Sequence, residues 1–120
     1  MMNRDRFKHF IVGERIKQIN RVLNSKADEY ATNDSAFYNF ERAGQINSDS
    51  PKKALWGMAT KHLVSVIDMV ESEQDFPDDY IDEKIGDLIN YLILLEGILK
   101  DKQCCGNWTE TGECRDWCKK

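Results

Sequence analysis

The stretch from Asp78 to Lys100, DDYIDEKIGDLINYLILLEGILK, constrains the fold more than any other part of the chain. Its apolar residues recur at alternating steps of four and three, which stacks them along one face of a helix. They are Ile81, Ile85, Leu88, Leu92, Leu95 and Leu99. From Leu88 onward this apolar band widens on both sides, and a helix that is apolar nearly all round must be covered by other helices. The stretch therefore predicts the central helix of a bundle.

The same helix carries a polar stripe beside the apolar one. By the same spacing, Glu83, Asp87, Asn90 and Tyr91 share a neighbouring face. Asn90 falls inside the apolar band, where an amide without hydrogen-bond partners costs about 1–3 kcal/mol. We therefore expect Asn90 to have either a structural partner or a ligand.

Length and composition set the class of protein. At 120 residues, with two prolines, seven glycines and no strand-like alternation, the chain predicts one all-α domain, a bundle of about three to four main helices. With 17 basic and 21 acidic residues the net charge is −4, which argues against nucleic acid as a partner. No apolar run is long enough for a membrane span, and the charged amino terminus lacks the apolar core of a signal peptide. We expect no membrane association and a cytoplasmic location.

The amino-terminal part predicts one long helix over about Asp5 to Tyr30, with apolar residues spaced to share a face. Lys26 interrupts that face. Its ammonium either reaches water along the helix surface or binds a phosphate. Glu29, three residues on, either pairs with Lys26 or supplies a metal ligand.

Residues 31–50 predict a loop with a short helix around Phe37 to Ala43. The aromatic cluster within it either closes the end of the bundle or stacks on a nucleobase. Asn39 lies between two of these aromatic residues and, in the second case, would bind a base edge.

A further helix begins at Pro51, with Ser50 as its cap, and runs to about Ser72. A short connection then leads to the last helix, so the two are expected to be antiparallel neighbours. His62 lies on the apolar face of the first of them, either as a core histidine or as a ligand.

Counting residues away from the turn near Asp75 predicts which side chains lie at the same height. Asp68 and Glu71 should lie near residues Asp79 to Glu83 of the last helix, and Lys61 and His62 should lie near Asp87 to Asn90. Carboxylates beside a lysine suit a Mg²⁺-bound polyphosphate, but a solvated charged surface has the same residues.

Four motifs, taken in order, resemble a family of phage and bacterial proteins called nucleotide modification associated domain 1. The motifs are KADEY at Lys26–Tyr30, NF at Asn39–Phe40, KHL at Lys61–Leu63 and EKIGDLINY at Glu83–Tyr91. That family is similar to the MazG-like, all-α nucleoside triphosphate pyrophosphohydrolases. The resemblance implies a MazG-like helical bundle, often a homodimer, and a location in the host cytoplasm if the chain is phage encoded.

The resemblance also implies a site. Glu83 and Asp87 match the catalytic, Mg²⁺-binding acids of the last motif, and Asn90 and Tyr91 match its nucleotide-facing end. The implied Mg²⁺ would be completed by one or two of Asp68, Glu71 and Glu29, and the implied substrate-binding residues are Lys26, Asn39, Lys61, His62, Asn90 and Tyr91. The chain departs from the MazG-like pattern at Lys84, where a second acid is usual, and in lacking a Glu-x-x-Glu pair on the preceding helix.

Two functions follow as expectations. The first is metal-assisted hydrolysis of a nucleoside triphosphate, in which a carboxylate-oriented water attacks the α-phosphorus and pyrophosphate leaves. The alternative is a non-catalytic protein on the same bundle, either a nucleotide sponge or an inhibitor of a host enzyme.

The composition changes after the last helix, which sets a boundary between a helical domain at 1–101 and a Cys/Trp-rich tail at 102–120. The tail holds all four cysteines, Cys104, Cys105, Cys114 and Cys118. Four thiols are a candidate Zn²⁺ site, although adjacent cysteines rarely both bind one ion. The alternative is a reduced tail whose Trp108 and Trp117 pack on the bundle or on a partner.

Overall fold

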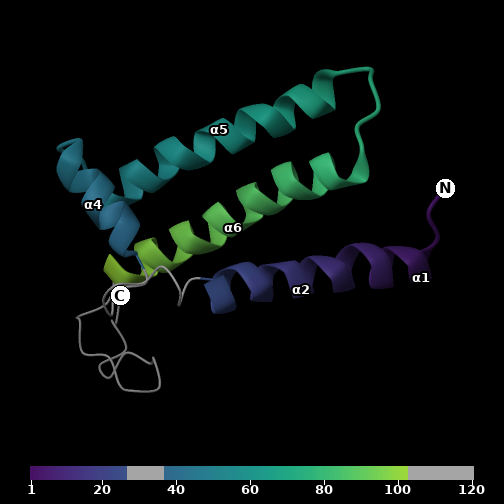
Figure 1. Ribbon diagram of the computed structural model, residues 1–120, viewed down its shortest axis with the longest axis horizontal. Helices are drawn as coiled ribbons and strands as arrows, with labels where there is room; N and C mark the ends of the chain where they lie inside the picture. Colours follow the sequence, from purple (N-terminus) through teal and green to yellow (C-terminus); the bar gives the residue numbers. More distant parts are fainter. Residues whose placement is uncertain (27–36, 103–120) are drawn as a thin grey trace.

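The fold is all-α, as the sequence predicted (Figure 1). The computed structural model describes residues 1–26 and 37–102, and no strand occurs among these residues. The cysteine tail, Glu29 and the side chain of Lys26 lie outside the described part, so the zinc and Lys26 predictions stay predictions. None of the described helices is both long enough and apolar enough to cross a membrane.

The amino-terminal helix is continuous from residue 4 to residue 26. It consists of α1 (Arg4–Arg6), the π-helical turns η1 (Phe7–Gly13), α2 (Glu14–Asn20) and the π-helical turns η2 (Arg21–Lys26). Asn3 caps it, because its side-chain oxygen accepts a hydrogen bond from the backbone N–H of Arg6 at 2.9 Å. The helix predicted from about Asp5 is therefore present, starting one residue earlier, and its predicted end at Tyr30 lies outside the described residues.

A short helix, α4 (Tyr38–Ile46), crosses one end of the bundle (Figure 1). It leads through a tight turn into α5, and the backbone N–H of Asp49 donates to the carbonyl of Gly44 at 2.7 Å. Gly44 is buried against that turn, and a Cβ there would lie 2.6 Å from the carbonyl oxygen of Asp49. Only glycine fits this approach without moving the backbone.

Two long antiparallel helices, α5 (Pro51–Glu71) and α6 (Asp78–Lys102), form the central hairpin. Ser50 caps α5 as predicted, accepting a hydrogen bond from the N–H of Lys53 at 3.3 Å, and Pro51 begins the helix. The core lies at the end of the hairpin that α4 covers. Its buried side chains are Phe40, Leu55, Ala59 and Ile98, with Phe37, Met58, Tyr91, Leu94 and Leu95 packed around them. The aromatic residues Phe37 and Phe40 thus close the bundle end, the first of the two roles proposed for them.

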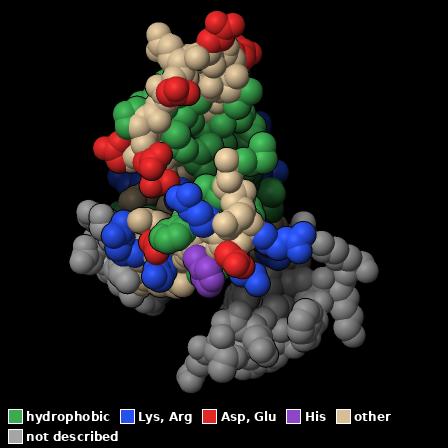
Figure 2. Space-filling view, turned by 90° about the vertical axis from the view of Figure 1, so that its right-hand side faces the viewer, with side chains coloured by type: hydrophobic (Ala, Val, Ile, Leu, Met, Phe, Trp, Pro, Cys, Tyr) green, Lys and Arg blue, Asp and Glu red, His purple; other side chains and the backbone are tan. Residues whose placement is uncertain are grey.

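Large apolar side chains stay exposed at the opposite end, where the α5–α6 connection lies. Figure 2 views that end and shows hydrophobic side chains at the surface, with acidic groups toward the top and basic groups below. Val70 of α5 is 78% exposed, and Phe7 and Phe10 of the amino-terminal helix are 53% and 63% exposed. One chain therefore leaves apolar surface uncovered here.

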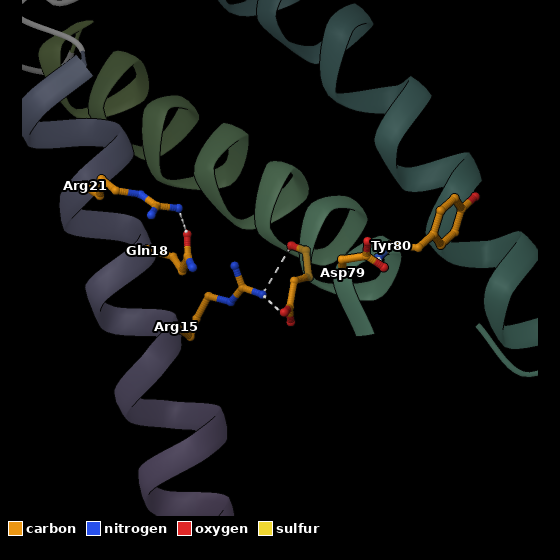
Figure 3. Close-up of polar contacts among 6 residues, drawn as sticks. Arg15, Gln18, Arg21, Asp79 and Tyr80 are labelled. Carbon is orange, nitrogen blue, oxygen red and sulfur yellow. Dashed lines mark hydrogen bonds and ion pairs between the residues drawn. The ribbon is translucent and has the colours of Figure 1, made fainter. Parts of the chain in front are cut away.

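Arg15 joins the amino-terminal helix to α6. Its Nη2 donates a hydrogen bond to the backbone carbonyl of Asp82 at 3.3 Å and lies 3.6 Å from the Asp82 carboxylate (Figure 3). The guanidinium also lies over Gly86, in the space that a Cβ would occupy. Because Gly86 has no side chain, α2 can lie close beside α6 at this point.

Gly57 offers a clean test of the helix α5. It lies in the helix interior, it is exposed, and a Cβ there would meet nothing within 4 Å. We expect Gly57→Ala to raise the free energy of unfolding by about 0.5–1 kcal/mol, because alanine restricts the unfolded chain and favours helix. Chemical denaturation measures the change.

Gly97→Ala is the matched control for that substitution. It makes the same change in α6, but its Cβ would lie 2.7 Å from the Phe37 ring. The ring must move, so the gain in helix propensity is offset. Equal stabilisation by both alanines would contradict the described packing of the Phe37 ring on α6.

Candidate functional site

The candidate site is built where α5 and α6 face each other next to the core. The side chain of His62 projects from α5, one turn beyond Ala59, and Asp87 and Tyr91 project from one face of α6. His62 Nδ1 lies 3.6 Å from Asp87 Oδ2. The sequence prediction that His62 and Asp87 lie at the same height is confirmed.

Aromatic rings connect this pair to the core. The His62 ring stacks on Tyr91, with 5.0 Å between centroids and 27° between planes. Phe40 of α4 meets Tyr91 edge-on, with 6.4 Å between centroids and 67° between planes. The site therefore lies beside the buried core and receives residues from all three helices.

The His62–Asp87 contact is an ion pair only when the imidazole is protonated. At 3.6 Å it is longer than a strong hydrogen bond, and the two side chains are 25% and 42% exposed. A pair this open to solvent contributes about 0–1 kcal/mol to stability. Asp87 therefore keeps capacity to accept further hydrogen bonds.

Asn90 supplies the most unusual feature of the site. Its Oδ1 is buried, and it has no hydrogen-bond partner among the described residues. The structural partner that the sequence analysis considered for Asn90 is therefore not found among the described residues. An unpaired buried acceptor costs about 1–3 kcal/mol, so this oxygen is poised to accept a donor.

The predicted carboxylate cluster does not form among the described residues, where no group of three metal-binding side chains lies together. Glu83 is 63% exposed and lies 3.9 Å from the ammonium of Lys84, while Asp87 lies beside His62. Asp68 and Glu71 are exposed on α5. Glu29, the remaining predicted ligand, lies outside the described residues, so the Mg²⁺ prediction stays a prediction.

The remaining predicted site residues lie around the pair. Lys61 is exposed on α5 next to His62, and Asn39 is exposed on α4 next to Phe40. Phe40 was expected as a closing or stacking aromatic residue, and the structure adds its contact with Tyr91. The aromatic cluster in the sequence pointed to Phe40, but the sequence does not show that Phe40 contacts the Tyr91 ring.

The site combines one buried acceptor, one half-exposed carboxylate, one imidazole and the phenol ring of Tyr91. Such a set suits a planar ligand edge that carries N–H donors, since Asn90 Oδ1 and Asp87 both accept. No protein-family model matches the chain, and comparisons with curated proteins and with solved structures also find no match.

Proposed function

We propose that the protein binds a nucleotide at the site formed by His62, Asp87, Asn90 and Tyr91. The observation that carries the proposal is the buried Oδ1 of Asn90, which has no hydrogen-bond partner in the described part of the chain. A nucleobase carries ring and exocyclic N–H groups that such an oxygen accepts. The resemblance of the motifs around His62 and Asp87 to nucleotide-handling proteins supports the same ligand class.

The neighbouring side chains suit the rest of a nucleotide. Asp87, 42% exposed, is a second acceptor within one turn of Asn90, and Lys61, next to His62 on α5, is exposed. A lysine at that position is a suitable counter-charge for a phosphate. The base would therefore meet the buried side of the site and the phosphates its solvent side.

Binding without catalysis fits the described residues better than hydrolysis does. Hydrolysis of a nucleoside triphosphate through Mg²⁺ needs a group of carboxylates around the ion. The described residues of one chain assemble no such group. The nucleotide sponge is thus the favoured function, and the pyrophosphohydrolase is its rival.

The test is a binding measurement with a panel of canonical and modified nucleoside triphosphates, with and without Mg²⁺, by titration calorimetry. We expect one or more to bind, and Asp87→Asn to weaken binding about tenfold, because a charged acceptor is lost. Asp101→Asn, an exposed change at the end of the same helix, is the matched control and should bind as the unmodified chain does.

Two outcomes would change the assignment. If no nucleotide of the panel binds at millimolar concentration, the proposed function is wrong. If nucleotide binds and pyrophosphate is released in the presence of Mg²⁺, the protein is a pyrophosphohydrolase and the sponge is excluded. Binding with no pyrophosphate release supports the proposal as stated.

We also propose that the functional protein is a homodimer. Large apolar side chains remain exposed along each long helix, including Phe10, Val64 and Leu92 at 63%, 50% and 47%. Large apolar side chains that one chain leaves uncovered are typical of subunit interfaces. These exposed apolar side chains would be buried against the second copy in the homodimer.

A further inference from the structure

An apolar groove lies between α5 and α6 at the end of the hairpin that is farthest from α4. Its volume is about 440 Å³, and its lining is mainly aliphatic and aromatic. The principal lining residues are Val66, Met69 and Val70 of α5, Phe76 of the connection, and Ile81 and Ile85 of α6. Val70 and Ile81 are 78% and 37% exposed, so the described residues leave this groove open.

The rim of the groove is strongly acidic. Between residues 71 and 83 the chain has no lysine or arginine and seven carboxylates, Glu71, Glu73, Asp75, Asp78, Asp79, Asp82 and Glu83. Asp75 lines the groove itself. The groove is therefore suited to a segment that is both apolar and basic.

The first turns of the amino-terminal helix have that chemistry. Arg4, Arg6 and Lys8 alternate with Phe7, Phe10 and Ile11, against the single acid Asp5. The apolar members Phe7, Phe10 and Ile11 are 53%, 63% and 45% exposed. In Figure 2 most basic groups lie below the apolar surface, and most acidic groups lie above it and along its left side, at the same end of the molecule.

Geometry prevents the segment from covering the groove of its own chain. Arg15 fixes the helix beside Asp82, and from there the helix continues roughly 15 Å to Arg4. α6 continues only about 6 Å from Asp82 to its start at Asp78. The amino-terminal turns therefore project past the start of α6, as Figure 1 shows.

We propose that this projecting segment, residues 4–12, docks into the acid-rimmed groove of a second copy, and that the second copy does the same in return. Segment and groove lie at the same end of each chain, so one two-fold axis beside that end satisfies both contacts. Phe7, Phe10 and Ile11 would fill the groove, and Arg4, Arg6 and Lys8 would face its carboxylates. The inference rests on the proposed homodimer and specifies its interface.

The test exchanges the charges of the two surfaces in separate proteins. The first carries Arg4→Glu, Arg6→Glu and Lys8→Glu, and the second carries Glu71→Lys, Glu73→Lys and Asp75→Lys. Each alone brings like charges together in its own dimer. We expect its dimer dissociation constant, measured by analytical ultracentrifugation, to rise about tenfold to a hundredfold.

Mixing the two proteins is the decisive step. In a mixed dimer, each acidic helix meets a basic groove and each basic helix meets an acidic groove, so we expect the heterodimer to form with near-original affinity. If the segment instead folded onto its own chain, mixing would restore nothing. Lys52→Glu with Lys53→Glu, two exposed changes at the far end of α5, is the control and should leave the dimer unchanged.

The outcomes separate this inference from the proposed function. If none of the charge changes alters the dimer dissociation constant, the proposed interface is wrong, but the homodimer itself is supported. A monomeric unmodified chain at micromolar concentration would overturn both the interface and the homodimer. Nucleotide binding at His62, Asp87 and Asn90 is measured independently, and neither result depends on it.

Discussion

Replacing Leu55 with alanine should lower the free energy of unfolding by about 2–5 kcal/mol, the largest effect expected of any single substitution in this chain. Leu55 is the one large side chain that is fully buried among the described residues, with an exposed fraction of 0%. It lies on α5 and belongs to the same core cluster as Phe40 of α4 and Ile98 of α6. Its removal leaves a cavity where three helices meet.

The expected loss is large relative to the stability of a small domain, about 5–15 kcal/mol. The described core is limited to four buried apolar residues, so truncating one of them removes a large share of it. Urea denaturation followed by circular dichroism measures the change, and the denaturant dependence should be unaltered if the fold is retained.

Leu92→Ala is the matched control, because it removes the same atoms from a side chain that is 47% exposed. At concentrations where the chain is monomeric, we expect it to cost less than half as much as Leu55→Ala. Equal losses in the monomer would show that the core is not centred on Leu55. A loss at Leu92 that grows with protein concentration would instead place this residue in a subunit contact.

The helices themselves could be predicted because their signals are local. Ser50 and Pro51 mark the start of α5 by a cap and a fixed backbone angle, and both act within one turn. The spacing of Ile85, Leu88 and Leu95 identifies a helix without knowledge of its neighbours. All-α architecture therefore followed from the sequence alone.

The pairing of His62 with Asp87 could also be predicted, because a short connection fixes the relative height of two antiparallel helices. Counting outward from Asp75 places the two residues opposite each other, and they lie 3.6 Å apart. Height alone does not fix the rotation of a helix about its own axis. Asp68 and Glu71 illustrate the difference, because both are exposed instead of gathering with Glu83 around an ion.

The position of the amino-terminal helix could not be predicted. Its anchor is the contact between Arg15 and Asp82, which are 67 residues apart in the sequence. The Arg15 guanidinium lies over Gly86 of α6, where there is no side chain in the way. Periodicity shows which face of a helix is apolar, but it does not show which partner covers that face. Phe7 and Phe10 belong to an apolar pattern, yet both are exposed in the single chain.

Asn90→Leu is expected to stabilise the protein while it removes nucleotide binding. Asn90 Oδ1 is buried without a hydrogen-bond partner among residues 1–26 and 37–102, and leucine has the same branching without a polar atom. Removing the unsatisfied acceptor should raise the free energy of unfolding by about 1–3 kcal/mol. For a chain of this length, the midpoint of thermal unfolding should rise by roughly 3–15 °C.

The opposite signs of the two effects make the prediction informative. A residue kept for stability should lose stability when it is replaced, whereas a residue kept for a ligand should gain stability and lose binding. Thermal unfolding of the free protein and calorimetric titration with the nucleotide measure the two effects on one variant. Addition of that nucleotide should stabilise the unmodified protein and leave the variant unchanged.

Asn20→Leu is the matched control, because Asn20 is an exposed asparagine on α2 whose side chain accepts a hydrogen bond only from Asn24 among the described residues. We expect its stability to change by no more than about 0.5 kcal/mol and its nucleotide binding to stay the same. If Asn90→Leu destabilises the free protein, its amide has a structural partner, and the nucleotide site loses its main support. A stabilised variant that no longer binds nucleotide would identify Asn90 as a residue whose buried oxygen is satisfied by the ligand.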